Sequence, residues 1–521
     1  MSTRRVWHAV CDLEDAAPHM GVCVAVDDRQ IAVFRVDDRL YALDNRDPAS
    51  GANILSRGIV GDLAGEVVVA SPMYKHHFSL ATGRCLEEPD YSVGTHPVRV
   101  VDGRVWVQVQ VQRRAKALGK RRLVVVGNGM AGMRTVEELL KIAPNIYDIE
   151  VFGAEPHGNY NRILLSPVLA GEKHVNEIML HPLAWYAERG VTLHTSDSII
   201  DIDRIERRVK SSSGLEVDYD RLLLATGSKP VMIPVPGAGL PGVVTFRDLH
   251  DVHTMLEAAR EHTHAIVIGG GLLGIEAANG LRCRGMDVTV VHLFDTLMER
   301  QLDAAAAQLL QRSLEKRGLT FKMSATTSAI LGDTRVTGVR FSDGSELPAD
   351  LVVMAVGIKP HIELAQRARL RCERGILVDD TLLTYDPCIY AVGECVQHRN
   401  STYGLVAPLW EQARVCAAHL AEIGLARYSG SLLATQLKVT GINLFSAGNF
   451  QDTVRSESLV FNDAKRGVYK RLIIEDDKVR GAVLYGDTTD GPWYVELMTQ
   501  GRSIGALRDK LLFGEAFAAN S

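Results

Sequence analysis

Residues 123–140 read Leu-Val-Val-Val-Gly-Asn-Gly-Met-Ala-Gly-Met-Arg-Thr-Val-Glu-Glu-Leu-Leu, and this stretch decides the fold of the chain. Four apolar residues predict a buried parallel strand, Gly127, Gly129 and Gly132 form G-x-G-x-x-G, and an amphipathic helix follows. In such a motif the first glycine permits a tight turn, the second lets the backbone approach a pyrophosphate, and the third lets the helix pack on the strand. The helix N-terminus then faces the phosphates. The stretch therefore predicts a dinucleotide-binding unit.

An acidic residue follows this unit at the spacing that dinucleotide sites use. The predicted strand Ile149 to Gly153 leads to Glu155, about 20 residues past the last glycine of the motif. A carboxylate at that place can accept hydrogen bonds from ribose hydroxyls. Glu155 is therefore a predicted ribose ligand.

A second motif of the same kind lies further along the chain. Residues 265–278 read Ala-Ile-Val-Ile-Gly-Gly-Gly-Leu-Leu-Gly-Ile-Glu-Ala-Ala, again an apolar strand, G-x-G-x-x-G and a helix. Its glycines Gly269, Gly271 and Gly274 are predicted to fix the pyrophosphate of a second dinucleotide. Two such motifs in one chain favour a hydride donor next to a flavin.

The residue that ends the next predicted strand leaves the choice of hydride donor open. Val288 to Val291 leads to His292, where an NADH-specific site usually carries Asp or Glu. Neutral histidine can hydrogen-bond a ribose hydroxyl, whereas protonated histidine with Arg300 nearby can accept a 2′-phosphate. A third interpretation is a strand-end side chain that points to solvent. The pattern therefore does not decide between NADH and NADPH.

The composition excludes several classes of function. With 521 residues the chain is long enough for about three or four domains. The formal net charge of -5 favours neither nucleic acid nor an anionic membrane as a partner. No apolar run approaches membrane-spanning length and the N-terminus lacks the apolar core of a signal peptide, so we expect no membrane association and a cytoplasmic location. The eight cysteines include no C-x-x-C pair, so neither a disulfide framework nor a metal-ligand set is evident.

Residues 1–112 are predicted to form an all-β domain. Short alternating runs broken by turns predict strands at Gly21 to Val26, Gln30 to Val36, Arg39 to Leu43, Val67 to Ala70 and Val98 to Val109.

Residues 71–78 of this domain read Ser-Pro-Met-Tyr-Lys-His-His-Phe. This stretch resembles the second cluster-binding loop of Rieske domains, C-P-x-H-G-x-x-F. The four ligand positions carry Asn45, Asp47, Ser71 and Tyr74 in place of two cysteines and two histidines. A Rieske centre needs two thiolates and two imidazoles. We therefore expect a Rieske-like domain with no iron–sulfur cluster and no other metal, and with a role in docking or structural support.

Further landmarks resemble flavoproteins with two dinucleotide domains. Residues 158–167, Gly-Asn-Tyr-Asn-Arg-Ile-Leu-Leu-Ser-Pro, lie where disulfide reductases carry a C-x-x-x-x-C pair, yet they contain no cysteine. Residues 219–228 end in Ala-Thr-Gly-Ser, and residues 389–395 match the family's A-x-G-D with Glu394 in place of Asp. Leu351 to Gly357 resembles the strand by which the chain returns to the flavin domain.

Together these features resemble the NAD(P)H-dependent nitrite reductase family. Residues 1–112 are similar to its small subunit and about 121–515 to the flavoprotein half of its large subunit; the chain is also similar to electron-transfer subunits of assimilatory nitrate reductase. The resemblance implies that FAD is bound by Gly127, Gly129, Met130, Ala131, Gly132, Glu155, Arg162, Thr226, Gly227, Gly393 and Glu394. It implies that NAD(P)H is bound by Gly269, Gly271, Leu272, Leu273, Gly274, His292 and Gly357.

The expected fold is multidomain. An N-terminal all-β Rieske-like domain precedes two doubly wound α/β dinucleotide-binding domains and a C-terminal α+β domain, in which Leu437 to Val439, Tyr469 to Glu475 and Val479 to Gly486 are expected strands. The predicted boundaries are 1–112 for the Rieske-like domain, 113–120 for a basic linker, 121–245 and 366–428 for two parts of the FAD domain, 246–365 for the NAD(P) domain and 429–521 for the last domain. The resemblance implies a homodimer through residues 430–521.

The expected function is an NAD(P)H-dependent FAD oxidoreductase that passes electrons to a separate catalytic subunit of nitrite or nitrate reduction. No side chain is needed as a catalytic acid or base, because the flavin carries the chemistry. Two alternatives stay open: a ferredoxin or rubredoxin reductase of an oxygenase system, which Pro167 disfavours, and a flavin-dependent redox sensor or assembly module.

Overall fold

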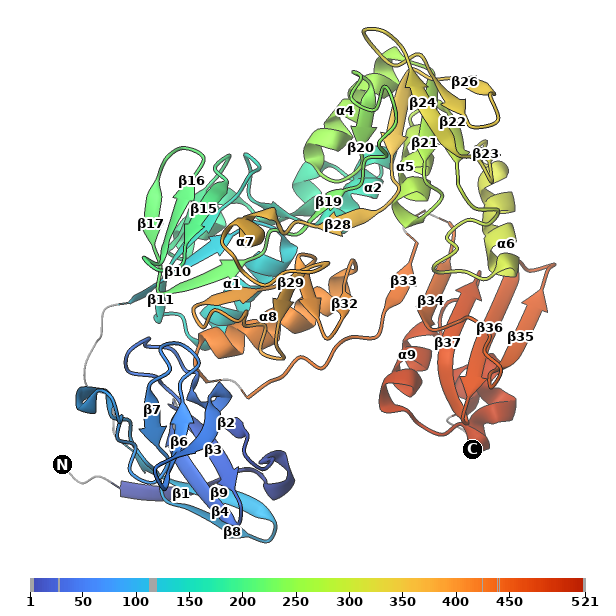
Figure 1. Ribbon diagram of the computed structural model, residues 1–521. Helices are drawn as coiled ribbons and strands as arrows, with labels where there is room; N and C mark the ends of the chain where they lie inside the picture. Colours follow the sequence, from blue (N-terminus) through green and yellow to red (C-terminus); the bar gives the residue numbers. More distant parts are fainter. Residues whose placement is uncertain are drawn as a thin grey trace.

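The computed structural model describes residues 4–26, 29–111, 120–423, 425–437, 439 and 441–518. Along these residues an N-terminal β domain is followed by two α/β domains and a C-terminal α+β domain (Figure 1). The predicted fold class is confirmed, whereas the domain boundaries stay predictions. The expected linker 113–120 lies outside the described residues apart from Lys120, whose Nζ is 3.4 Å from Asp148 Oδ1.

The N-terminal domain is built from three-stranded antiparallel sheets with the orders β1-β9-β8, β2-β3-β4 and β5-β6-β7. The strands are β1 (Arg4–Asp12), β2 (Gly21–Val26), β3 (Arg29–Val36), β4 (Arg39–Asp44), β5 (Ile59–Leu63), β6 (Glu66–Ala70), β7 (His77–Ser79), β8 (Val98–Val101) and β9 (Arg104–Val111). Val24, Ile31 and Val33 are buried on the neighbouring strands β2 and β3 and form part of one apolar cluster. The single run predicted at Val98 to Val109 is wrong, because Asp102 and Gly103 adopt positive φ angles of 51° and 75° and turn the chain into a hairpin.

The first α/β domain contains a parallel sheet of order β14-β11-β10-β18-β30. Its strands are β10 (Arg121–Val126), β11 (Tyr147–Phe152), β14 (Val191–His194), β18 (Arg221–Leu224) and β30 (Ile389–Ala391), and its longer helices are α1 (Met130–Ile142) and α8 (Val406–Leu420). Leu123, Val124, Leu222 and Leu223 are fully buried, as expected for central strands covered on both faces. The last strand of this sheet, β30, follows the second α/β domain in the chain. The second domain is therefore an insertion within the sequence of the first.

Smaller elements complete this domain. They are β12 (Asn159–Tyr160), α2 (Leu165–Ala170), β13 (Met179–His181), α3 (Leu183–Glu188), β15 (Ile199–Asp203), β16 (Arg208–Ser211), β17 (Glu216–Asp218), β19 (Ser228–Pro230), α7 (Glu363–Arg367), β29 (Ile376–Val378), β31 (Val396–His398) and β32 (Ser401–Thr402).

The second α/β domain repeats the same plan, with a parallel sheet of order β20-β27-β21-β22-β23. Its elements are β20 (Val243–Thr245), α4 (Leu249–Glu261), β21 (His264–Ile268), α5 (Leu272–Cys283), β22 (Asp287–Val291), α6 (Ala304–Glu315), β23 (Thr320–Lys322), β24 (Thr327–Leu331), β25 (Gly338–Phe341), β26 (Glu346–Pro348) and β27 (Leu351–Met354). Strand β28 (Ile358–Pro360) pairs with β19 and carries the chain back to the first domain.

The C-terminal domain packs helix α9 (Gly491–Gln500) on an antiparallel sheet of order β33-β34-β37-β36-β35. The strands are β33 (Ala434–Gln436), β34 (Leu444–Gly448), β35 (Glu457–Asp463), β36 (Val468–Glu475) and β37 (Lys478–Tyr485), and a short helix α10 (Glu515–Ala518) follows. The strand predicted at Leu437 to Val439 is wrong, since β33 ends at Gln436. Leu437 and Val439 are apolar because they pack into the core cluster of the second α/β domain.

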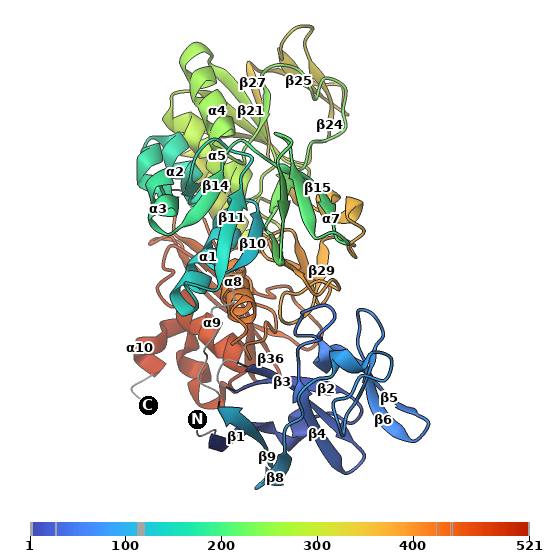
Figure 2. The same cartoon turned by 90° about the vertical axis from the view of Figure 1, so that its left-hand side faces the viewer.

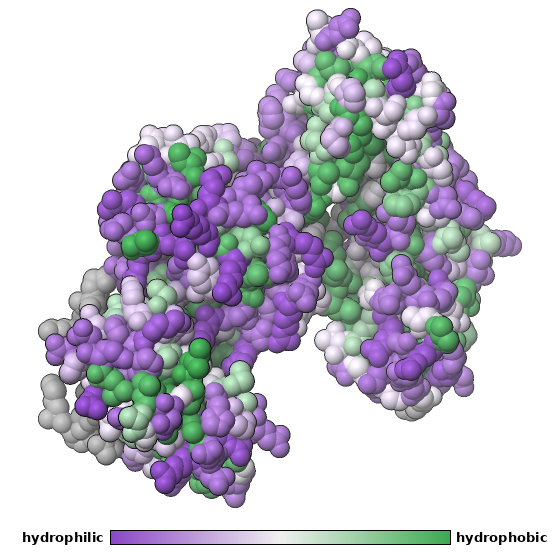
Figure 3. Space-filling view, in the orientation of Figure 1, coloured by the Kyte–Doolittle hydropathy of each residue, from purple (hydrophilic) through white to green (hydrophobic). Residues whose placement is uncertain are grey.

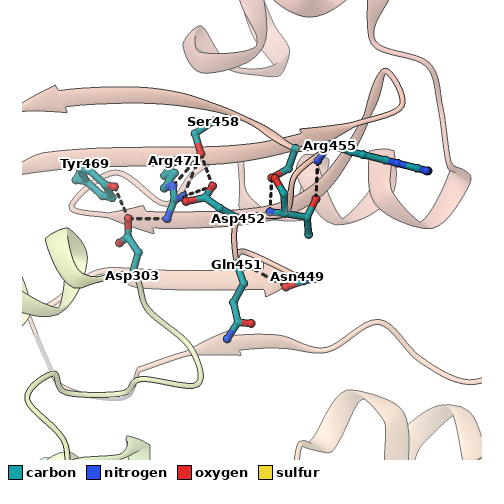
Figure 4. A network of polar contacts seen from close by, with 10 residues as sticks. Asp303, Asn449, Gln451, Asp452, Arg455, Ser458, Tyr469 and Arg471 are labelled. Carbon is teal, nitrogen blue, oxygen red and sulfur yellow. Dashed lines mark hydrogen bonds and ion pairs between the residues drawn. The ribbon is translucent and has the colours of Figure 1, made fainter.

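A polar network fastens the C-terminal domain to the second α/β domain (Figure 4). Asp303, the N-cap of α6, accepts hydrogen bonds from the Tyr469 hydroxyl and from Arg471 Nη1, the latter at 3.3 Å. Arg471 Nη2 also donates to Asp452 Oδ1 at 2.6 Å. The two domains also share an apolar cluster that includes Leu310, Leu444 and Tyr469, whereas a deep notch separates the C-terminal domain from the N-terminal and first α/β domains (Figure 3).

The N-terminal domain lies below the first α/β domain, near α8 and β29 (Figure 2). Arg57 forms an ion pair with Asp379. Arg207 Nη2 donates to the carbonyl of Ser50 at 2.9 Å, and Arg221, the first residue of β18, donates to that of Gly51 at 3.4 Å. The loop at Ser50 and Gly51 therefore contacts the amino end of β18, at the edge of the sheet opposite the one at which the first glycine motif follows β10.

Candidate functional site

The first fingerprint, Gly127, Gly129 and Gly132, lies between β10 and α1 as predicted. Gly127 has a φ of 110°, and a Cβ there would stand 2.3 Å from the carbonyl oxygen of Ala225. A Cβ on Gly132 would meet Ala225 Cβ at 2.9 Å, so this glycine lets the helix approach the strands. A Cβ on Gly129 would meet nothing within 4 Å. The backbone at the start of α1 thus borders open space, as a phosphate site requires.

The second fingerprint, Gly269, Gly271 and Gly274, repeats this geometry between β21 and α5. Gly269 has a φ of 121°, and a Cβ there would stand 2.3 Å from the carbonyl oxygen of Ala355. A Cβ on Gly274 would lie 1.9 Å from the carbonyl oxygen of Gly269, whereas one on Gly271 would meet nothing within 4 Å. Both motifs therefore leave their middle glycine open.

A cavity of about 710 Å³ lies between the two α/β domains. Of the predicted residues, it is lined by Gly127, Gly129, Met130, Ala131, Glu155, Arg162, Thr226, Gly227, Gly393, Glu394, Leu272 and Leu273. Gly132, Gly269, Gly271, Gly274, His292 and Gly357 lie outside it. The two helices that start at the fingerprints contribute side chains to one space, since Met130 belongs to α1 and Leu272 and Leu273 to α5.

Glu155 lines this cavity with both carboxylate oxygens already engaged. Its Oε1 is paired with Arg162, and its Oε2 accepts a hydrogen bond from Tyr160 Oη at 2.8 Å. Burial raises the pKa of Tyr160, which keeps the phenol protonated as a donor. A carboxylate has about four acceptor sites, so Glu155 retains capacity for a ribose hydroxyl.

Glu394 forms a bridge between the domains. It is ion-paired with Arg247, which precedes α4 in the second domain, and its Oε2 accepts a hydrogen bond from Ser228 Oγ at 2.8 Å. Arg247 and Ser228 also line the cavity, and the sequence pattern did not identify either of them.

A second bridge, also unforeseen, crosses the cavity wall. Ser166 Oγ of α2 donates a hydrogen bond of 2.5 Å to Glu276 Oε2 of α5, and both residues are buried. Glu276 lies four positions after Leu272, on the same helical face. A glutamate among apolar residues on that face was the signal that could have identified it, because buried carboxylates are rare without a partner.

The geometry fits FAD. The middle glycine leaves room for a pyrophosphate at the start of α1, and the cavity has apolar walls at Leu272, Leu273 and Leu409 beside a few fixed polar groups.

The residues at the four predicted Rieske ligand positions do not fit an iron–sulfur cluster. Asn45 Nδ2 donates to Gln30 Oε1 at 3.2 Å, and Asn45 Oδ1 accepts from the Ser56 amide at 2.7 Å. Asp47 accepts a hydrogen bond from the Ser71 hydroxyl, and both side chains are fully buried, whereas Tyr74 is exposed. An amide, a carboxylate, a hydroxyl and a phenol supply neither thiolates nor imidazoles.

Other binding modes have no support in the part of the chain that the structure describes. Within those residues no group of three or more His, Cys, Asp or Glu side chains could hold a metal ion. Nor is any described helix long and apolar enough to cross a membrane.

His292 is 7% exposed, so the interpretation as a strand-end residue pointing to solvent is wrong. Its ring contacts the second fingerprint instead, since Nδ1 lies 3.0 Å from the Gly270 amide nitrogen.

Family models match three parts of the chain. The model for pyridine nucleotide-disulphide oxidoreductases matches residues 121–419, the Rieske-like [2Fe-2S] domain matches residues 6–108, and the rubredoxin NAD+ reductase C-terminal domain matches residues 434–502.

Several known proteins are similar over most of the chain. The NAD(P)H nitrite reductase of Bacillus subtilis (strain 168) is 50% identical over 374 residues, which cover 72% of this chain and 46% of that protein. The assimilatory nitrate reductase electron transfer subunit of the same organism is 44% identical over 393 residues, 75% of this chain and 51% of that protein. The chain thus spans about half the length of these two relatives. A ferredoxin reductase structure from Rhodopseudomonas palustris has a TM-score of 0.68 and 28% identity, covering 74% of this chain and 96% of that one.

Proposed function

The chain belongs to the pyridine nucleotide-disulphide oxidoreductase family, and from this premise we propose that it passes electrons from NAD(P)H through FAD to a separate catalytic subunit of nitrite or nitrate reduction. It is an NAD(P)H-dependent flavin oxidoreductase of the nitrite and nitrate reductase lineage. The observation that carries the proposal is the cavity that the first fingerprint shares with Leu272, Leu273 and Glu276 of the second domain.

The chain's own residues have binding and orienting roles in this proposal. FAD, when bound, supplies the chemistry that connects a two-electron donor to a further acceptor. Gly129 keeps the start of α1 open to the pyrophosphate, and Glu155 faces the cavity as a ribose acceptor. The pairs Arg247–Glu394 and Ser166–Glu276 hold the two domains at a fixed spacing, which orients donor and acceptor toward each other.

The proposed acceptor rests on the relatives. One of them is named as an electron transfer subunit of assimilatory nitrate reductase, and the similarity extends over 75% of this chain. We infer that the N-terminal domain carries no cluster and acts as a docking or supporting domain, because its four former ligand positions carry hydrogen-bonding residues.

Anaerobic stopped-flow spectroscopy tests this function. The purified holoprotein is mixed with NADH or NADPH, and the reduced protein is then mixed with nitrite, with nitrate, or with a candidate catalytic subunit encoded nearby in the genome. We expect rapid bleaching of the flavin band, no reoxidation by either anion alone, and reoxidation when the subunit and its anion are both present. Absence of bleaching with both coenzymes, or fast reoxidation by nitrite alone, would contradict the proposal.

A ferredoxin reductase is the second candidate. The fold similarity to the Rhodopseudomonas palustris enzyme covers nearly all of that chain and favours it. Fast reoxidation of the reduced protein by a ferredoxin or rubredoxin, with no response to the reductase subunit, would support this candidate over the first.

A further inference from the structure

The loop 292–303 is fastened to the second fingerprint. His292 Nδ1 lies 3.0 Å from the Gly270 amide nitrogen, and the Met298 amide donates to the carbonyl of Gly270 at 3.0 Å. A Cβ on Gly270 would stand 2.7 Å from Leu297 Cδ2 and 2.8 Å from His292 Cγ. The loop therefore packs directly against the turn that the second fingerprint forms.

The hydrogen bonds assign a neutral ring to His292. An amide nitrogen can only donate, so Nδ1 is the acceptor and the ring proton sits on Nε2. Nε2 lies 3.1 Å from Glu299 Oε2, which accepts that proton's hydrogen bond. A doubly protonated ring would direct a second N–H at the Gly270 amide, so this arrangement does not suit a cationic clamp on a 2′-phosphate.

Glu299 thereby places a carboxylate beside the end of β22, where the chain carries His292 in place of an acidic residue. Its side chain is 27% exposed, so it is reachable from solvent while its neighbour His292 is not. Arg300 neutralises the Glu299 carboxylate only weakly, because its side chain is 86% exposed and its Nε lies 3.9 Å from Glu299 Oε1. A carboxylate at this edge of a fingerprint unit accepts ribose hydroxyls and disfavours a 2′-phosphate.

The far end of the same loop is also fixed. Asp303 Oδ1 accepts the Ala306 amide at 3.1 Å and caps α6, while Asp303 Oδ2 is held by Tyr469 and Arg471 of the C-terminal domain (Figure 4). The loop that carries Glu299 is therefore held at both ends.

We propose that Glu299, held by His292, determines the choice of coenzyme and makes the protein prefer NADH to NADPH. Glu299 is the discriminating residue and His292 a positioning residue. The inference rests on the proposed use of NAD(P)H and adds the coenzyme to it.

The test compares the wild type with Glu299→Gln, which keeps the shape of the side chain and removes its charge. Asp287→Asn is the matched control, because it removes one carboxylate at the opposite end of β22, where Asp287 pairs with Arg282 at 3.2 Å. Equilibrium titration of the oxidised holoprotein with NAD⁺ and NADP⁺ gives the dissociation constants. Anaerobic flavin reduction by NADH and NADPH gives the rates.

We expect the wild type and Asp287→Asn to favour the non-phosphorylated coenzyme by roughly tenfold or more, and Glu299→Gln to lose roughly tenfold of that ratio. His292→Phe should lose part of the ratio, since Glu299 then lacks its donor. A wild type that binds both coenzymes equally or prefers NADP⁺, or an unchanged ratio in Glu299→Gln, would overturn the inference while leaving the proposed function standing. Absence of binding and of flavin reduction with both coenzymes would overturn the proposed function and the inference together.

Discussion

Replacing Gly129 by asparagine is expected to weaken FAD binding strongly without unfolding the protein. Gly129 is the N-cap of α1 with φ −84° and ψ 176°, a conformation open to any residue, and its Cβ would meet nothing within 4 Å. Asparagine is a favoured N-cap, so the free energy of unfolding of the FAD-free protein should change by less than about 0.5 kcal/mol. The side chain would instead occupy the space over the first turn of α1.

The expected loss of affinity follows from the contacts that this bulk prevents. If two backbone N–H groups can no longer reach the pyrophosphate, two charge-assisted hydrogen bonds of about 1.5–3 kcal/mol each are lost. The sum of about 3–6 kcal/mol corresponds to a loss of roughly 150-fold to 25,000-fold in FAD affinity.

Gly127→Ala is the control that affects folding. An alanine at position 127 would have to adopt a φ of 110° and would place its Cβ 2.3 Å from the Ala225 carbonyl oxygen. The substitution should therefore lower the free energy of unfolding by at least about 2 kcal/mol. Urea unfolding of the FAD-free proteins and FAD titration followed by flavin fluorescence separate the two effects. A Gly129→Asn protein that binds FAD as tightly as the wild type in this titration would refute the assignment of the FAD site. One that is destabilised as much as Gly127→Ala would refute the claim that the space over Gly129 is open.

Further predictions concern the other domains. Elemental analysis of the purified protein should find no iron above trace, whereas about two iron atoms per chain would show that a cluster is bound despite the residues at positions 45, 47, 71 and 74. Tyr469→Phe removes one hydrogen bond to Asp303 and should lower the free energy of unfolding by about 1 kcal/mol in urea; an unchanged midpoint would mean that the network does not stabilise the domain junction. Partial burial raises the pKa of Glu87, but hydrogen bonds from the backbone amide and the ring of His77 lower it by a larger amount. The net result is a pKa of about 2, compared with the ordinary value of 4.5. Because the folded-state pKa is the lower one, Glu87 stabilises the N-terminal domain above about pH 4.5, and this contribution is lost as the pH falls toward 2. Glu87→Gln should flatten the pH dependence of unfolding in that window, and an unchanged slope would contradict the assignment.

Local patterns were enough to predict the fingerprints. Four apolar residues before Gly127 and again before Gly269 indicate buried parallel strands, and the glycine spacing follows from contacts within one turn of chain. The same holds for Glu155, which lines the cavity at the predicted spacing from the first motif.

Contacts between distant segments were not predictable in this way. Arg247 reaches Glu394 and Ser166 reaches Glu276 only because the folded chain brings two domains together, and no spacing along the sequence encodes those pairs. Leu437 was mistaken for a strand residue because burial in a neighbouring domain and burial in a sheet select the same apolar side chains.

The docking of the N-terminal domain has a consequence for the order of synthesis. Its Ser50–Gly51 loop contacts Arg207 and Arg221, which precede the inserted domain, while Arg57 contacts Asp379, which follows it. During translation the β domain can fold first, since domains form as units from the N-terminus. It then lacks its contact with Asp379 until the segment that follows the inserted domain emerges from the ribosome and β30 pairs with β18. The first domain made therefore completes its contacts only after the inserted domain has been made, and its contacts with Arg221 and Asp379 lie on both parts of the first α/β domain.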